Sequence, residues 1–414
     1  MKLNNPNYLN GLEASASEID GNINRGKQTL VILGDSITSR NSNDNFFKDI
    51  SHTGPVVWAN AIAGQPFELI FNAGVNGQNS TQILARVQAD VIDKNPSHCM
   101  FLMGMNDNPT NDTTLKANII ATYTALNTNG IFSYICTNTT TKTDLEKNKR
   151  ALRINNWIKS YFKNLPNCEI IDLCSAWIDP LSESGLIRDD VSSDGVHPTN
   201  NGGLLGGIVI AEHFKKLRIT SQLPSSSLDD YSINSSALNL TKNPLLVGEA
   251  GTLQGTSTGK VANNIIGYTS GGATVFSKEI RSDGTGENQV LSITGSLSTQ
   301  SRIQCSTTYR PLAGERFFAI CEIEIVSAVN LRKFGMMLYR DNTVASSVLT
   351  AGVTPEFELQ IPSGGLKVIL KTQILTATTN TLSNFFIQIP FYSMETGTTN
   401  IEAKIGRVGI IKVN

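Results

Sequence analysis

Val31-Ile32-Leu33-Gly34-Asp35-Ser36 is the stretch of sequence that decides the fold prediction. Its apolar residues continue a run that begins at Thr29. A short apolar run that ends at a glycine is typical of a strand buried on both faces of a parallel sheet. In an open parallel sheet, the functional crevice lies beyond the carboxyl ends of the strands. The sequence therefore predicts that Ser36 lies in such a crevice.

The alternation of short apolar runs with helical patterns continues to about residue 218. We predict strands over residues 29–33, 69–71, 99–103, 131–136 and 169–173. We predict helices over residues 79–93, 114–127, 144–163 and 203–216. The first of these helices begins with the capping-box-like Asn79-Ser80-Thr81-Gln82. Strands that alternate with helices indicate an α/β domain with a parallel sheet and helices on both faces.

The character of the sequence changes after residue 218. A polar stretch with Pro224 and three consecutive serines is predicted to be a linker. Farther on, the period-two alternation of strands replaces the helical patterns, as in Phe357, Leu359 and Ile361. This alternation predicts an antiparallel β-sandwich, jelly-roll-like in form. The predicted parts are a lead at residues 1–24, the α/β domain at 25–218, the linker at 219–244 and the β-sandwich at 245–414.

The composition argues against some classes of protein. The formal net charge is −1 and 17% of the residues are charged, so no basic patch points to a nucleic-acid partner. The apolar runs are too short for membrane insertion, and residues 1–27 lack the apolar core of a signal peptide. We therefore expect a protein that is cytoplasmic or that leaves the cell by another route, such as release in a virus particle.

The residue types that bind metals show no pattern. The six cysteines form no C-x-x-C pair and no zinc-like spacing with histidine, so we expect buried free thiols. Three of the four histidines, His52, His98 and His213, lie in no motif and are expected to be structural. We therefore predict no metal ion and no cofactor.

The fourth histidine lies in Asp194-Gly195-Val196-His197-Pro198. Acyl transfer needs a hydroxyl nucleophile, an imidazole base and a carboxylate that orients the imidazole. Ser36, His197 and Asp194 can supply these three groups. Taken alone, Ser36 has the alternative role of a helix cap after a strand.

Two further segments are predicted at the same edge of the sheet. Gly77 follows the strand predicted at residues 69–71, where a glycine N–H can point at a developing anion; Gly74 is the alternative. Asn106 follows the strand predicted at residues 99–103 and can donate from its side chain, although Asn-Asp is also common in turns. With the N–H of Ser36, these groups would form an oxyanion hole.

Neighbouring residues are given simpler roles. Asp35 and Asp107 are expected to make structural hydrogen bonds, and Trp58 and Phe67 are expected in the core rather than in a substrate cleft. Arg40 follows the serine closely and is either a solvated charge or a substrate contact.

Together these residues resemble the SGNH hydrolase superfamily, also called GDSL-type esterases. The resemblance covers about residues 25–218, and Ile37 stands where leucine is common in the family. The four sequence blocks of the family occur here in order, as Gly34-Asp35-Ser36-Ile37, Gly74-Val75-Asn76-Gly77, Gly104-Met105-Asn106-Asp107 and Asp194-Gly195-Val196-His197.

The resemblance implies a flavodoxin-like, three-layer α/β/α domain and metal-free ester hydrolysis. It implies Ser36 as nucleophile, His197 as general base and then general acid, and Asp194 as the group that holds the imidazole. It also implies an oxyanion hole made by the N–H groups of Ser36 and Gly77 and the side chain of Asn106.

The whole chain resembles phage tail-fibre or tailspike proteins, and carbohydrate esterases with an appended β-sandwich. This resemblance predicts an esterase that removes acyl groups, O-acetyl first of all, from a polysaccharide such as bacterial capsule or O-antigen, with a homotrimer as the assembly. The alternatives are a bacterial carbohydrate esterase on plant or other glycans, a lysophospholipase or thioesterase, and a receptor-binding module without activity. The β-sandwich is expected either to bind carbohydrate or to serve oligomerisation.

Overall fold

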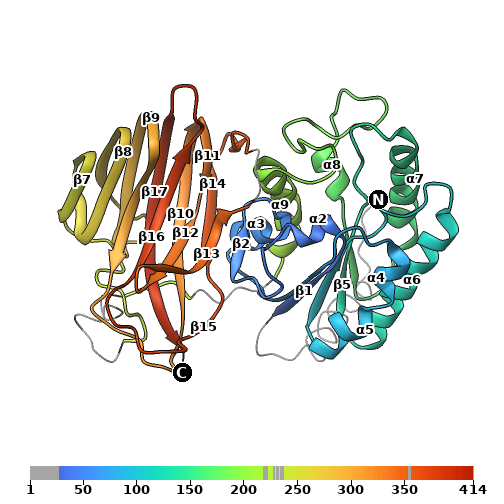
Figure 1. The fold of residues 1–414 in the computed structure, drawn as a ribbon, viewed down its shortest axis with the longest axis horizontal. Helices are drawn as coiled ribbons and strands as arrows, with labels where there is room; N and C mark the ends of the chain where they lie inside the picture. The colour runs from blue at the N-terminus through green and yellow to red at the C-terminus, as the bar shows by residue number, and fades with distance from the viewer. Residues whose placement is uncertain are drawn as a thin grey trace, which may run out of the picture.

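The computed structural model describes residues 28–217, 222–226, 229, 233, 237–352 and 356–413. These residues form an α/β lobe and, beside it, a lobe made of strands (Figure 1). The predicted lead, residues 1–24, and much of the predicted linker, residues 219–244, lie outside the described residues. The domain boundaries themselves stay a prediction.

In the described part of the chain, a five-stranded parallel sheet is the centre of the α/β lobe. Its strands, in the order in which they lie, are β3 (Glu68–Gly74), β1 (Thr29–Gly34), β4 (His98–Phe101), β5 (Phe132–Cys136) and β6 (Cys168–Ile171). Numbered along the chain within this sheet, the order is 2-1-3-4-5, which is the order of flavodoxin-like folds. The predicted α/β fold with a parallel sheet is confirmed.

Alternate residues of β1 face the two layers of helices that cover the sheet. Leu30 and Ile32 pack into one core, whereas Val31 and Leu33 pack into the other, and all four are buried. The first core is covered by α3 (Pro55–Ile62), α8 (Leu173–Trp177) and α9 (Asn200–Phe214). The second is covered by α4 (Ser80–Leu84), α5 (Val87–Asp90), α6 (Asp112–Thr128) and α7 (Leu145–Tyr161).

The predicted helix over residues 79–93 is wrong in its extent. Its capping box is present, with the Asn79 side chain accepting from the Gln82 N–H, but the chain then forms α4, α5 and a 3-10 turn at Ile92–Lys94 in place of one helix. Arg86 lies in the first break. Its side chain donates to Gln78 and to the carbonyl of Gly34, so the break serves to bind the end of β1.

The second lobe is a large, mostly antiparallel sheet that folds over itself. The strand β9 belongs to both halves, because its first part pairs with β17 and its last part with β16. Residues from both halves, such as Ile293, Ile323 and Ile389, are fully buried in one core. The predicted antiparallel β-domain is thus confirmed, although its two layers are continuous and the pair β7–β8 is parallel. The strands are β7 (Ala250–Gly259), β8 (Val261–Ile280), β9 (Glu287–Ser306), β10 (Arg316–Val329), β11 (Leu331–Phe334), β12 (Met336–Arg340), β13 (Thr343–Ala351), β14 (Leu366–Lys371), β15 (Leu375–Thr376), β16 (Phe385–Ser393) and β17 (Asn400–Val413).

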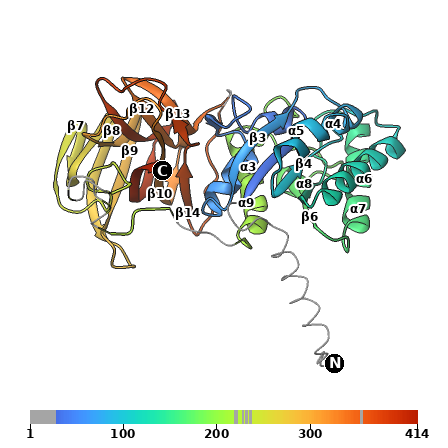
Figure 2. The ribbon, with the colours of Figure 1, turned by 90° about the horizontal axis from the view of Figure 1, so that it is seen from below.

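A strand of the α/β lobe joins the sheet of the other lobe. The strand β2 (Asp49–Ser51) pairs in parallel with β13, a pairing that the sequence did not predict. The next residue, His52, donates its N–H to the carbonyl of Ala351 at 2.8 Å, and its buried ring lies 3.1 Å from the Glu356 carboxylate. The helices α3 and α9 fill the space between the parallel sheet and the β-lobe (Figures 1 and 2).

Residues 356–361 do not form the strand that their alternation predicts. The N–H of Phe357 donates to the side chain of Asn200 at 2.7 Å, and the N–H of Gln360 donates to that of Asn201 at 2.9 Å. Both asparagines lie at the start of α9. Helix side chains, rather than a neighbouring strand, therefore take these hydrogen bonds.

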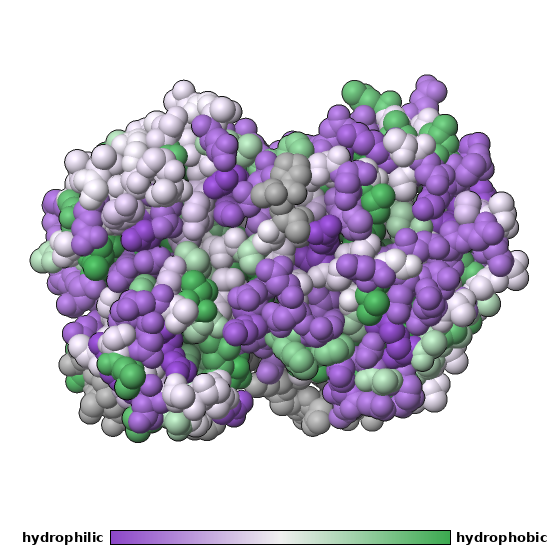
Figure 3. All heavy atoms as spheres, viewed as in Figure 1, coloured by the Kyte–Doolittle hydropathy of each residue, from purple (hydrophilic) through white to green (hydrophobic). Residues whose placement is uncertain are grey.

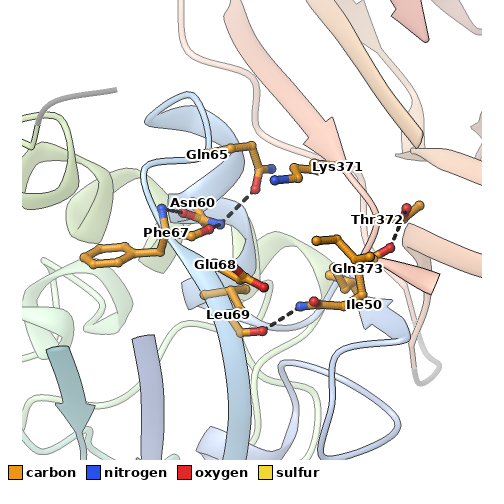
Figure 4. A pocket seen from close by; sticks show the side chains of 10 residues that line it. Ile50, Asn60, Gln65, Phe67, Glu68, Leu69, Lys371, Thr372 and Gln373 are labelled. Carbon is orange, nitrogen blue, oxygen red and sulfur yellow. Dashed lines mark hydrogen bonds between the residues drawn. The ribbon is translucent and has the colours of Figure 1, made fainter. Parts of the chain in front are cut away.

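A second set of hydrogen bonds crosses a small pocket between the lobes (Figure 4). The side chain of Gln65 donates to the carbonyl of Ile369, and that of Gln373 donates to the carbonyl of Leu69, each at 2.6 Å. Asn60, on α3, donates to Gln65 and holds it in place. Side chains of each lobe thus bind the main chain of the other.

Asn200→Ala should destabilise the whole protein. The Asn200 side chain is fully buried and makes three hydrogen bonds to Arg332 and Phe357 of the β-lobe. Alanine would leave buried main-chain groups without partners, at roughly 1–3 kcal/mol per group, so we expect the free energy of unfolding to fall by about 3 kcal/mol. Denaturant-induced unfolding measures the change. Asn164→Ala, at an exposed position, is the control, and equal effects of the two substitutions would contradict the role given to Asn200.

Candidate active site

Ser36 begins α2 (Ser36–Ser39), a single turn of helix that directly follows β1. Asp35 caps this helix, because its side chain accepts a hydrogen bond from the N–H of Ile37 at 3.0 Å. The cap is therefore Asp35 and not Ser36. The N–H of Ser36 donates to no other group in the described part of the chain, as is usual in the first turn of a helix.

Ser36, His197 and Asp194 form a continuous chain of hydrogen bonds. The Nε2 atom of His197 lies 2.8 Å from Ser36 Oγ, and its Nδ1 atom lies 2.7 Å from Asp194 Oδ2. A carboxylate at Nδ1 favours the tautomer that carries its proton there, which leaves Nε2 free to accept the proton of Ser36. The fold therefore brings together the nucleophile, the base and the orienting carboxylate that the sequence predicts.

The turn that Asp194 begins also holds its carboxylate. Asp194 Oδ1 accepts hydrogen bonds from the N–H groups of Val196 and His197 at 2.9 and 2.8 Å. Burial raises the pKa of Asp194, but the hydrogen bonds from the N–H and ring of His197 and from Val196 outweigh it and lower this pKa to about 2. Gly195 permits the turn, since its φ is +83° and a side chain there would meet Lys142.

The other two groups predicted for an oxyanion hole lie in the loops after β3 and β4. Gly77 has a φ of +77°, and its N–H donates to no other group of the described residues. Asn106 donates its side-chain N–H to the carbonyl of Gln78 at 3.1 Å, directly after Gly77. The N–H of Gly74 already donates to the Asn72 side chain, which favours Gly77 over this alternative. The oxyanion role of these groups stays a prediction.

Buried polar residues that the sequence analysis did not assign to the site hold the loop of Asn106. Arg150, on α7, donates to the carbonyls of Gly104 and Asp107, at the two ends of this loop. The Asp107 carboxylate, expected to be structural, accepts from the N–H and the hydroxyl of Ser80 at 2.8 and 2.5 Å. Because Ser80 begins α4, the loops after β3 and β4 are joined.

The sequence carries one signal for Arg150. It lies four and eight residues before Ile154 and Ile158, which are buried on α7. A charge on the apolar stripe of a helix must be paired when it is buried, so the position points to an internal partner. The partner itself could not be named, because it is main chain in a distant loop.

Asp35 is fully buried beside Ser36. Burial raises its pKa, the hydrogen bond from Ile37 lowers it and the charge of Asp107 raises it further, and the result is a pKa of about 6. The two carboxylates of the site are therefore perturbed in opposite directions. Asp194 is ionised throughout the neutral and mildly acidic range, whereas Asp35 becomes protonated near pH 6.

Four further residues singled out from the sequence occupy structural positions, as predicted. Trp58 and Phe67 are buried in the core. His98 is buried against Phe67, and burial lowers its pKa to about 4. His213 lies 2.9 Å from the Glu169 carboxylate.

The six cysteines are free thiols, and all but Cys168 are buried. No group of three His, Cys, Asp or Glu side chains in the described chain is placed to hold a metal ion. Among the described helices, none combines the length and the apolar character needed to cross a membrane.

A comparison with known protein families identifies the α/β lobe. Residues 32–203 match the GDSL-like lipase/acylhydrolase family. These residues form a GDSL-like lipase/acylhydrolase domain. The match includes all of the predicted site residues, namely Ser36, Gly77, Asn106, Asp194 and His197. The GDSL-like domain is thus an ester hydrolase of the SGNH type.

Several solved structures resemble the GDSL-like domain. The lipase/acylhydrolase from Enterococcus faecalis is 18% identical, covers 48% of this chain and 100% of its own, and gives a TM-score of 0.36. An acetyl xylan esterase variant from Geobacillus stearothermophilus is 18% identical, with coverages of 47% and 97% and a TM-score of 0.37. A GDSL-like lipase from Bacteroides thetaiotaomicron is 18% identical, with coverages of 49% and 97% and a TM-score of 0.36. No curated protein sequence matches the chain.

Asp35→Asn should stabilise the GDSL-like domain at neutral pH. Because the folded-state pKa of Asp35 is raised, its ionisation destabilises the fold progressively as the pH rises from about 4 to about 6. Asparagine keeps an acceptor for Ile37 and removes the charge. We expect the stability difference between variant and wild type to grow by about 3 kcal/mol between pH 4 and pH 7, measured by denaturant unfolding. A difference that does not vary with pH, or one that Asp93→Asn at an exposed position reproduces, would contradict this assignment.

Asn106→Ala should slow ester hydrolysis without unfolding the domain. An oxyanion donor acts in the transition state, and its loss typically lowers kcat about 10²- to 10³-fold. The side chain of Asn106 is exposed, so the fold does not depend on it. Steady-state kinetics with p-nitrophenyl acetate measure the effect. Asn108→Ala, in the same loop and also exposed, should keep the wild-type rate; similar rates for both variants would remove Asn106 from the site.

Proposed function

We propose that the GDSL-like domain removes acyl groups, and O-acetyl groups first of all, from a polysaccharide through a covalent acyl-enzyme on Ser36. The hydrogen-bonded chain from Ser36 Oγ through His197 to Asp194 carries the proposal. This arrangement supplies every proton transfer of ester hydrolysis from the protein's own side chains.

The first half of the reaction forms the acyl-enzyme. Ser36 Oγ attacks the ester carbonyl carbon while His197 Nε2 takes its proton. The carbonyl oxygen becomes an oxyanion, for which the N–H groups of Ser36 and Gly77 and the Asn106 side chain are the proposed donors. The C–O bond to the sugar then breaks, and the imidazolium gives its proton to the leaving alkoxide. Asp194 stabilises the imidazolium in each tetrahedral intermediate.

The second half of the reaction releases the acid. A water molecule takes the place of the sugar, gives a proton to His197 Nε2 and attacks the acyl carbon. The second tetrahedral intermediate collapses, the proton returns to Ser36 Oγ and the carboxylic acid departs. His197 is thus the base and then the acid in each half.

The surroundings of Ser36 favour a sugar ester over a lipid ester as the substrate. An open pocket begins at Ser39, which lies three residues after the nucleophile on α2. Among its lining residues, all but one glycine have polar side chains. The face of the molecule in Figure 3 is mostly hydrophilic, with apolar residues in small scattered groups. A lysophospholipase or a thioesterase of long acyl chains would need an apolar groove at this place.

Capsule or O-antigen as the substrate, binding of carbohydrate by the β-lobe, a trimeric assembly and a place in a virion tail are proposals from resemblance alone. Tests of the esterase do not depend on them.

Substitution of Ser36, His197 and Asp194 tests the mechanism. Ser36→Ala and His197→Ala should each lower kcat for p-nitrophenyl acetate by about 10³-fold or more. Asp194→Asn should lower it less, by about 10²-fold, because this side chain is half exposed and water can replace part of its role. Ser160→Ala, at an exposed site on α7, is the matched control. Wild-type turnover in the Ser36 variant would reject the esterase proposal and favour a binding module without activity.

Acetate release identifies the substrate class. Wild-type protein and the Ser36→Ala variant are incubated with acetylated polysaccharides and, separately, with lysophospholipid. Serine-dependent release of acetate from a polysaccharide supports the proposal. Serine-dependent release of fatty acid, without any release of acetate, would replace it with a lipid substrate.

A further inference from the structure

A polar pocket lies between the nucleophile and the β-lobe. The elements around it are α2, the loop that leads to Gly77 and the segment around β2, with one residue from the end of β13. The residues that line it are Ser39, Arg40, Ser42, Asn43, Ser51, Thr53, Asn76 and Gly352. Ser39 lies on the same helical turn as Ser36 and donates its hydroxyl to the Ser36 carbonyl at 2.9 Å, so the pocket lies beside the turn that carries the nucleophile.

The frame of this pocket is fixed by hydrogen bonds. The carbonyl of Arg40 accepts from the Thr53 hydroxyl at 3.1 Å, and Ser51 and Thr53 share a further hydrogen bond at 2.8 Å. On the opposite side, the Ser39 hydroxyl donates to the Asn76 side chain at 2.7 Å. The main chain of Arg40 is held on both sides, because its N–H donates to the carbonyl of Ser36 on α2 at 3.3 Å and its carbonyl accepts from Thr53.

The guanidinium of Arg40 has no partner in this frame. Its side chain makes no hydrogen bond and no ion pair with any described residue. Arg40 is also the one charged residue among those that line the pocket. An arginine that is half-buried in a concave site without a carboxylate presents five N–H donors to whatever enters.

We propose that the Arg40 pocket binds the carboxylate of a uronic-acid-type sugar, so that the polysaccharide is acidic. This inference rests on the proposed esterase function and specifies its substrate. The planar guanidinium matches a carboxylate in a bidentate pair. The exposed amides of Asn43 and Asn76 can bind the hydroxyl groups of the same sugar, whereas the lining hydroxyls of Ser42 and Thr53 are buried and already hydrogen-bonded within the protein.

A single cation with neutral hydroxyls and amides suits a carboxylate better than a phosphate. A phosphate monoester carries up to two negative charges and three acceptor oxygens, which are usually met by several cations or main-chain N–H groups. A neutral sugar would offer the guanidinium only hydroxyl and ring oxygens, without the charge assistance and the bidentate geometry of a carboxylate. A carboxylate is therefore the ligand group that matches the one cation of this pocket.

Calorimetry with a matched pair of probes tests the proposal. The probes are the trimer of galacturonic acid and the trimer of galactose, in which an uncharged hydroxymethyl group replaces each carboxylate. For the wild type we expect the acid to bind at least about 10-fold more tightly than the neutral trimer, as a charge-assisted bidentate pair should give. Arg40→Gln should remove this preference, and Arg40→Lys should keep only part of it because the ammonium lacks the fork.

Arg316→Gln is the matched control, since it removes one positive charge at an exposed position on β10, opposite Val413 at the end of β17. This variant should keep the wild-type preference, and unfolding midpoints of all variants report whether each is folded. Equal binding of the two probes by the wild type would overturn the proposal, and so would a preference that survives in Arg40→Gln. Binding of inorganic phosphate that depends on Arg40, with no binding of the acid trimer, would overturn it in favour of a phosphate site.

The esterase proposal and the acidic-sugar proposal can be rejected independently. Calorimetry needs no turnover, so an inactive protein that binds the acid trimer through Arg40 would reject the esterase and leave a sugar-binding pocket. An active esterase without this binding would retain the catalytic proposal and lose the acidic substrate.

Discussion

The enclosure of β1 is the constraint on which the active site depends. This strand pairs with β3 and β4 along its edges, and its two faces are covered by separate layers of helices. A strand that is fixed in this way cannot change its register without moving an entire core. Ser36, which follows it directly, is therefore held against the loops that leave β3 and β4.

Electrostatic surroundings give the two acidic residues of the site different properties. Asp194 lies in a turn whose N–H groups stabilise its charge, whereas Asp35 lies in the core, where burial opposes ionisation. An orienting carboxylate must remain charged while the histidine next to it changes protonation. Asp194, in its exposed turn, can remain charged in this way. Asp35 caps the helix of Ser36 and does not need to be charged for that role.

Much of the α/β lobe, and the grouping of Ser36, His197 and Asp194, could be predicted from local sequence pattern. The apolar runs determine the parallel strands, and the four motif blocks name Ser36, Gly77, Asn106 and His197. Contacts between distant segments could not be predicted. The breaks after α4 depend on Arg86 reaching Gly34, and the segment at 356–361 alternates like a strand but binds helix side chains. Arg150 binds main-chain carbonyls, and these are present in every residue, so the sequence cannot indicate which of them it binds.

The pairing of β2 with β13 also limits how the protein can be divided. A cut between the lobes would leave β13 with an unpaired edge, and such edges promote association with other chains. It would also expose to water the outer sides of α3 and α9, whose apolar residues belong to the same core as those of the β-lobe. The β-lobe is thus part of the scaffold of the hydrolase, and not an accessory carried on a tether.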